Sequence, residues 1–86
     1  MSKYEVIGYE HRSGISKRSG KPYDMDIIHV AECLPLMQTE DSYGRRVEQV
    51  IFNRLVVGEP AVQPQIGDTI AVYYNRSGYP EDFQII

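Results

Sequence analysis

The residues best suited to chemistry are concentrated between positions 12 and 25, in the stretch RSGISKRSGKPYDM. It holds four of the nine basic residues and no acidic residue before Asp24. Glycine, serine and proline are typical of an exposed hairpin loop, which could simply be a solvated tip. Cations beside Tyr23 also suit a single-stranded nucleic acid, because Lys and Arg neutralise phosphates and flat rings stack on bases.

The distribution of charge matters more than its sum. The chain has nine basic and twelve acidic residues and a net charge of −3, which disfavours a partner that is polyanionic along the whole molecule. From His11 to Tyr23 there are four basic residues and no acidic one, so the other five basic residues share the rest of the chain with all twelve acidic residues. Since charge interactions are screened within about 10 Å, one basic arm on an acidic body can still bind nucleic acid. An acidic protein partner is the alternative.

Residues that could catalyse a reaction or bind a metal are few. His29 and Cys33 would lie about 13 Å apart on one strand, too far to share a metal ion. We therefore expect a strand histidine and a small buried thiol. Asp24 and Asp26 share a strand face and are expected to balance Lys and Arg across the hairpin. No phosphate-binding glycine loop, nucleophile elbow or HExxH motif occurs, so the sequence predicts a non-enzyme without cofactor or metal.

Five short strands are predicted to position the basic segment, which forms a long hairpin loop between the first two. Alternating apolar residues and β-branched enrichment place them at residues 4–9, 23–33, 45–57, 69–76 and 81–86. The apolar phase of the second strand restarts after Ile27, which predicts a bulge or bend there. Residues 45–57 also fit helical spacing, although strand is favoured.

The connections predict how these strands are arranged. Residues 58–68 carry two prolines and two glycines, which predicts a connector without a useful helix, and Ser77 and Gly78 are expected at the tip of a turn. Strands of this number and length favour an all-β fold, a small OB-like barrel or a sandwich. We expect residues 1–86 to form one OB-like domain, a five-stranded barrel with a protruding basic β-hairpin.

The start of the chain and the cysteine content predict a location. The sequence MSKYEVIGYE has no apolar signal-peptide core, and no apolar run is long enough to span a membrane. A single cysteine rules out an internal disulfide and fits a reducing compartment. We therefore expect a cytoplasmic protein.

Tyrosine is the second signal for nucleic acid. Seven tyrosines and no tryptophan is an unusual aromatic content for 86 residues. Tyr23 follows the basic loop, two further tyrosines end the fourth strand near Arg76, and Tyr79 lies just past the turn. Tyrosine is also a common strand residue, so about half of these rings are expected only to pack.

The order of residues in the basic segment is similar to a known hairpin. The run from Arg12 to Lys17, followed by Gly20-Lys21-Pro22-Tyr23, resembles the basic hairpin of filamentous-phage single-stranded DNA-binding proteins of the gene-five, or helix-destabilising, type. The spacer here is one residue longer, and Met25 supplies the family's apolar position. Similarity elsewhere is weaker: EPAVQPQIGDTIAV resembles a connector and strand, and NRSGY falls where the family has a loop near its dimer axis.

The resemblance implies an OB-like barrel that forms a homodimer and coats single-stranded DNA cooperatively, with little sequence specificity, during phage or mobile-element replication. It implies phosphate contacts at Arg12, Lys17 and Lys21 and base contacts at Tyr23 and Met25. RNA could occupy the same surface. Strand alternation would turn both aspartates of the hairpin to the opposite face. The candidate nucleic-acid-binding residues are Arg12, Lys17, Arg18, Lys21, Tyr23, Met25, Arg76 and Tyr79.

Overall fold

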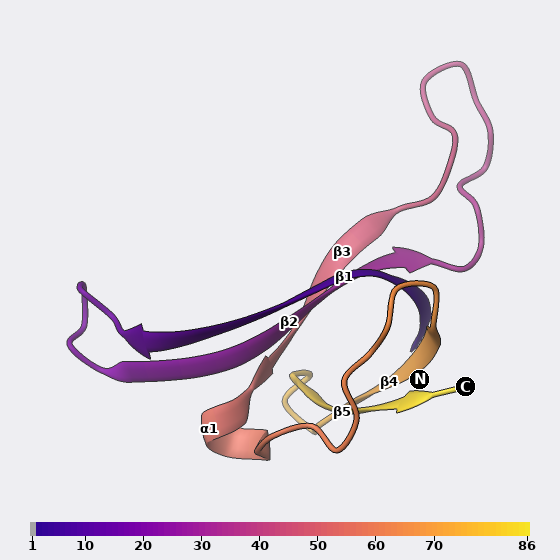
Figure 1. Cartoon of the computed structure of the whole chain (residues 1–86). Coiled ribbons are helices and arrows are strands. Elements are labelled where there is room, and N and C mark those ends of the chain that lie inside the picture. The colour runs from indigo at the N-terminus through magenta and orange to yellow at the C-terminus, as the bar shows by residue number, and fades with distance from the viewer. Residues whose placement is uncertain (1) are drawn as a thin grey trace.

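A computed structural model describes residues 2–86 as a curled antiparallel sheet (Figure 1). Its elements are β1 (Ser2–Ile15), β2 (Pro22–Glu32), β3 (Val47–Asn53), α1 (Arg54–Val57), β4 (Thr69–Tyr74) and β5 (Pro80–Ile85). The strand order is β3-β2-β1-β4-β5, and every neighbouring pair is antiparallel. The prediction of five strands in an all-β arrangement is confirmed.

The sheet is not closed into a barrel. Within residues 2–86, the edge strands β3 and β5 share no strand pairing. They meet instead through side chains, since the rings of Phe52 and Phe83 pack with centroids 5.5 Å apart. Both strands are short, and the chain leaves β3 for α1 at Asn53, so the gap between the edges is lined by side chains rather than bridged by a ladder.

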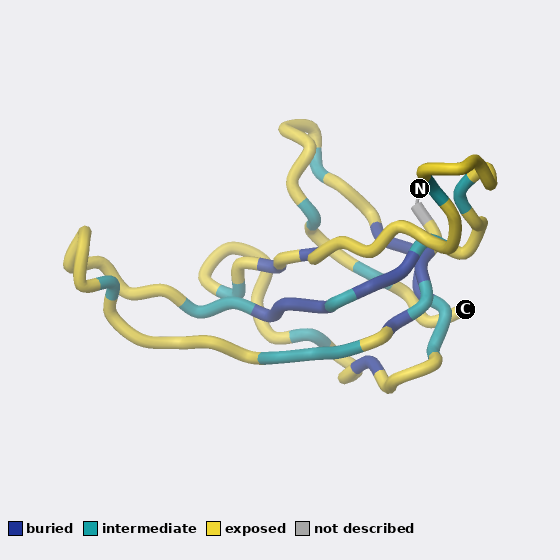
Figure 2. Tube along the Cα trace, turned by 90° about the horizontal axis from the view of Figure 1, so that it is seen from above, coloured by how far each residue is buried: buried dark blue, intermediate teal, exposed yellow. Residues whose placement is uncertain are grey.

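The core lies in the body of the curled sheet, where the buried positions gather (Figure 2). It is built from alternate positions on four strands, as the two-residue period of a strand requires. Burying each large aliphatic side chain contributes about 1.5–3 kcal/mol. The buried cluster comprises Tyr4, Val6, Ile28, Val30, Val50, Phe52, Ile70 and Val72.

There is no bulge near Ile27, which was one of the two alternatives predicted there. The pairing of β2 runs without interruption through Ile27 to both β1 and β3, and the irregularity lies in β1, between Val6 and Gly8. Ile27 and Ile28 are both buried although they point to opposite faces. Ile27 lies on a strand flanked by β1 and β3, directly opposite Glu10 and Ile51.

The β1–β2 hairpin extends well beyond the rest of the sheet (Figure 1). Strand pairing continues to Ile15 and Pro22, so the loop covers only residues 16–21 and is shorter than predicted. The Ser16 amide donates to the Lys21 carbonyl at 2.9 Å, and the Gly20 amide donates to the Ser16 carbonyl at 2.8 Å. Gly20 has φ of 71°, which a glycine adopts without strain.

The third predicted strand is shorter than expected. Residues 47–53 form a strand, but residues 54–57, predicted to continue it, form the one helical turn of α1, which begins where the Asn53 side chain accepts a hydrogen bond from the Leu55 amide at 3.0 Å. In the β4–β5 turn, the Asn75 side chain accepts bonds from the Ser77 and Tyr79 amides. Ser77 and Gly78 form the tip, as predicted. Among residues 2–86, no helix has the length and apolar character needed to cross a membrane.

Candidate nucleic-acid interface

The pairing of β1 with β2 sorts the hairpin side chains onto two faces. Tyr23 lies opposite Gly14, and Met25 lies opposite Arg12, so these four residues share one face, which we call the Tyr23 face. Asp24 and Asp26 alternate with them and point to the other side. The predicted separation of the aspartates from Tyr23 and Met25 is therefore confirmed.

The glycine opposite Tyr23 leaves space for its ring. A β-carbon at Gly14 would lie 3.2 Å from the Tyr23 hydroxyl oxygen and 3.4 Å from Cζ. Gly14 also has φ of 156°, which L-residues rarely adopt. The ring thus lies across its own hairpin and remains 36 % exposed. A partly covered ring with one accessible side is suited to stacking against a flat ligand.

Three of the predicted cations lie at the end of the hairpin. Lys17 and Arg18 are exposed in the loop, and exposed Lys21 closes it. None of the ion pairs found among residues 2–86 involves these three side chains. Their charges are therefore available to phosphates.

Arg12, the fourth cation, is held by an acid of its own strand. Its Nε donates to Glu10 Oε2 at 2.9 Å, and its Nη2 approaches Glu10 Oε1 at 3.4 Å. His29 Nε2 lies 3.2 Å from the same Oε1. The hydrogen bond from Arg12, followed by that from His29, lowers the pKa of Glu10. Sequence analysis missed Glu10, although its position two residues before Arg12 places both side chains on one face.

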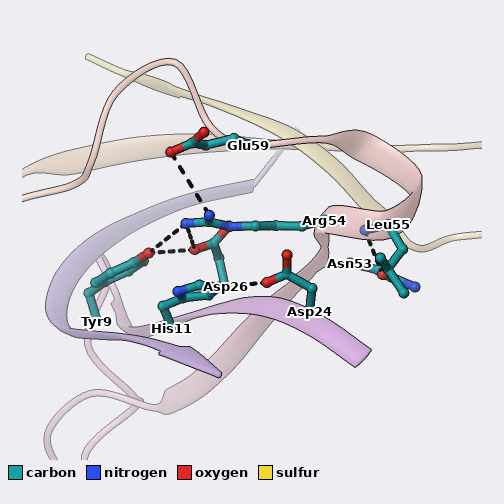
Figure 3. Close-up of polar contacts among 8 residues, drawn as sticks. All are labelled: Tyr9, His11, Asp24, Asp26, Asn53, Arg54, Leu55 and Glu59. Carbon is teal, nitrogen blue, oxygen red and sulfur yellow. Dashed lines mark hydrogen bonds and ion pairs between the residues drawn. The ribbon is translucent and has the colours of Figure 1, made fainter. Parts of the chain in front are cut away.

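The hairpin aspartates have partners other than the predicted Lys and Arg of the hairpin. Asp24 Oδ1 lies 2.5 Å from His11 Nε2. Asp26 accepts hydrogen bonds from Arg54 Nε at 2.7 Å and Nη2 at 2.9 Å, and another from the Tyr9 hydroxyl (Figure 3). The loop cations lie beyond the paired strands, whereas Asp26 points inward toward α1. Both aspartates are thus engaged away from the Tyr23 face.

Asp26 is a buried charge with a complete set of partners. It is only 2 % exposed, while the side chain of Arg54 is 17 % exposed. Burial by itself raises the pKa of Asp26, but the hydrogen bonds from Arg54 and Tyr9 outweigh it and hold the pKa below its ordinary value. Burial, together with the bond to Asp26, raises the pKa of Tyr9, so its hydroxyl remains a donor. This cluster fixes the base of the hairpin.

Arg76 and Tyr79 lie elsewhere. The turn that carries them joins β4 to β5, and it projects from a different part of the molecule than the hairpin loop (Figures 1 and 2). The pairing of β4 with β1 is confined to Ser2–Glu5, at the end of β1 away from the hairpin loop. The structure therefore gathers six of the eight candidates on the hairpin and places two apart.

An acidic cleft lies where the sheet stays open. It is lined by apolar side chains that include Phe52 and Phe83, and by the acids Glu59, Glu81 and Asp82. Only Glu59 among these three approaches a cation, with Oε1 3.9 Å from Arg54 Nη1. Phosphates are repelled by such a rim, so the cleft is a poor place for nucleic acid.

The soft donors do not form a metal centre. Cys33 is exposed just beyond the end of β2, so the prediction of a buried thiol is wrong. The half-buried His29 packs against Gly8 and contacts Glu10. Residues 2–86 contain no group of three or more His, Cys, Asp or Glu placed to hold a metal ion.

Comparison with known proteins gives no relative from which a function could be inferred. No family model, curated protein or solved structure matches the chain. What the hairpin offers is three exposed cations without acidic partners in and beside the loop, next to a tyrosine ring that stays partly exposed, with Asp24 and Asp26 directed to the other face. Such a surface can hold phosphates and bases together.

Proposed function

We propose that the protein binds single-stranded DNA through the Tyr23 face and the hairpin loop, with little sequence preference. The observation that carries this proposal is the segregation of the hairpin. Tyr23 and Met25 share a face with Arg12 at the base of a loop with three unpaired cations, while Asp24 and Asp26 face the other way. The order of these residues, which resembles the phage hairpin, supports the same assignment.

Each residue has a defined part in this proposal. Lys17, Arg18 and Lys21 contact phosphates, because they are exposed and carry no acidic partner. Tyr23 stacks on a base, and Met25 packs beside it. A stacked base is worth about 1–3 kcal/mol and tolerates any sequence, since every base has a flat face.

Three further features belong to the same proposal. The curled sheet is an open variant of the OB-like barrel, in which the Phe52–Phe83 contact replaces the closing ladder. Arg76 and Tyr79 act as secondary contacts outside the hairpin surface. Finally, the chain forms homodimers that coat the strand cooperatively during replication of a phage or mobile element in its bacterial host's cytoplasm. Sedimentation with and without oligonucleotide tests the dimer, which should have twice the mass of the chain.

Fluorescence anisotropy tests the binding itself. Labelled oligo-dT, oligo-U and a duplex of equal length are titrated at several salt concentrations. We expect the single strand to bind better than the duplex, with log K falling by roughly 0.7 per phosphate neutralised and a total slope of about −2 to −4. Absence of binding at low salt, or equal binding to duplex, would overturn the proposal. Comparison of oligo-U with oligo-dT decides between RNA and DNA.

A second candidate is a protein-interaction module whose hairpin binds an acidic partner. The exposure of Leu34, Met37 and Tyr43 in the long loop between β2 and β3 favours it, because exposed apolar side chains are common at protein contacts. Polyglutamate separates the two readings. An interaction module should bind it as well as oligo-dT, whereas a strand binder with a stacking tyrosine should prefer the oligonucleotide.

A further inference from the structure

Arg12 is the one hairpin cation whose guanidinium already has an anion. Glu10 contacts both Nε and Nη2, the paired donors that an arginine also presents to a phosphate. The Arg12 side chain is 61 % exposed and its carboxylate partner is 35 % exposed, so the pair is within reach of a ligand. A phosphate arriving at Arg12 must compete with Glu10 for the same donors.

Glu10 is itself held in position from a second strand. His29 Nε2 lies 3.2 Å from the carboxylate oxygen that Nη2 approaches, so the carboxylate lies between β1 and β2 partners. The His29 ring also packs over Gly8, where a β-carbon would lie 3.4 Å from His29 Cδ2, at van der Waals contact. The position of Glu10 is therefore set by the fold and not only by Arg12.

The location of this pair makes the competition consequential. Arg12 lies directly opposite Met25, and Glu10 lies opposite Ile27, next along the same face toward the sheet. A strand whose base stacks on Tyr23 and packs on Met25 brings its phosphates near Arg12. Beyond Arg12, the next side chain of β1 on this face is the negatively charged Glu10.

We propose that Glu10 acts as an intramolecular competitor of phosphate at Arg12, weakening the grip of the hairpin on nucleic acid so that binding stays readily reversible. This inference rests on the proposed function. Glu10 is a positioning residue, because it acts on the ligand through Arg12. A coating protein must leave its strand when the strand is copied, and a built-in competitor lowers the affinity without removing a cation.

The test compares Glu10→Gln with a matched variant far from the hairpin, Glu81→Gln. Both remove one negative charge, but exposed Glu81 lies in β5 at the acidic cleft. In oligo-dT titrations we expect Glu10→Gln to bind about two- to five-fold tighter at low salt, within the range of one exposed ion pair. Its salt slope should be more negative by about 0.7, because Arg12 then contributes a full phosphate contact. Glu81→Gln should change neither quantity comparably.

A double-mutant cycle separates the specific effect from a general one. In an Arg12→Ala background, Glu10→Gln should no longer steepen the slope, since the cation that it releases is gone. A gain that persists without Arg12, or equal gains in Glu10→Gln and Glu81→Gln, would overturn the inference. Nuclear magnetic resonance of the free protein gives a readout without DNA: the Arg12 Nε–H should be protected from exchange in the wild type and lose that protection in Glu10→Gln.

The outcomes for the two proposals are distinguishable. A wild type that binds no single strand removes the proposed function, and the competitor role falls with it. A wild type that binds while Glu10→Gln leaves affinity and slope unchanged removes only the competitor role. Unprotected Arg12 Nε–H in the wild type contradicts it as well.

Discussion

At the scale of single residues, two kinds of interaction are expected to divide the binding energy. Stacking on Tyr23 depends on a neutral ring, whereas the contacts of Lys17 depend on charge and on the release of counterions. These contributions respond differently to salt. Affinity and salt slope, measured together, therefore assign a role to each residue.

Replacing Tyr23 by Ala should cost about 1–3 kcal/mol of binding free energy with little change in the salt slope. Replacing Lys17 by Ala should instead make the slope shallower by up to about one unit. Anisotropy titrations of both variants with oligo-dT provide the check, and Tyr23→Phe, which keeps the ring, is the control. Two variants with the same affinity loss and the same slope would contradict these roles.

Arg54 is the residue on which the base of the hairpin most depends. Removing it would leave the Asp26 carboxylate buried beside Tyr9 alone, and breaking a buried ion pair in this way costs about 3–5 kcal/mol. We expect Arg54→Met to lower the free energy of unfolding by that amount in urea titrations. Combining it with Asp26→Leu should restore part of the loss. A single variant as stable as the wild type would show that the pair is not needed.

The same pair predicts how stability changes with pH. The pKa of Asp26 is lower in the folded chain than its unfolded value of about 3.9. Its stabilising contribution is therefore complete above that value and is lost as the pH falls through the folded pKa. Urea titrations between pH 7 and pH 2 should show the wild type losing stability below about pH 4, and Asp26→Asn losing less. Parallel curves for the two proteins would contradict this assignment.

At the scale of elements, local pattern predicted most of the fold. Alternation located the five strands, and Asn75 with Gly78 marked the β4–β5 turn, because these signals act over a few residues. The pairing of Asp26 with Arg54 joins positions 28 residues apart, and no local signal reports which cation a curled strand will meet. The burial of both Ile27 and Ile28, on opposite faces of β2, likewise depends on neighbours that are distant in the sequence.

The hairpin candidates show the same division. The cations of residues 16–21 and the faces of Tyr23 and Met25 followed from sequence order and strand alternation. The sequence alone did not predict that Arg76 and Tyr79 lie away from the hairpin. It also did not predict that Glu10 binds Arg12. Both facts depend on how the strands are arranged in space. Local sequence pattern also could not predict whether the barrel closes, because closure depends on whether the two short edge strands come within hydrogen-bonding distance.

Replacing Gly14 tests whether the hairpin must hold the Tyr23 ring in its present position. A methyl group in Gly14→Ala would approach the Tyr23 hydroxyl oxygen to 3.2 Å and displace the ring. We expect weaker binding to oligo-dT than in the wild type, by less than the loss in Tyr23→Ala, with an unchanged salt slope. Gly44→Ala is the control, because Gly44 also has positive φ, at 91°, but nothing lies within 4 Å of a β-carbon there. Equal binding by both glycine variants would show that the ring position does not matter.

At the scale of the whole molecule, charge is segregated between a basic hairpin and an acidic cleft. The molecule is elongated, 46 Å along its longest axis, and the hairpin extends away from the body (Figure 1). The cations of the loop therefore stand clear of Glu81 and Asp82 at the cleft, although the net charge is −3. Screening over about 10 Å further separates the two surfaces.

The location of the bound strand is the central claim, and resonance mapping tests it most directly. Isotope-labelled protein is titrated with oligo-dT at low salt while backbone and side-chain resonances are followed. We predict the largest shifts at Tyr23, Met25 and residues 16–21, with Glu81 and Asp82 unchanged. Shifts centred on the acidic cleft, or none at the hairpin when the strand is bound, would contradict the account.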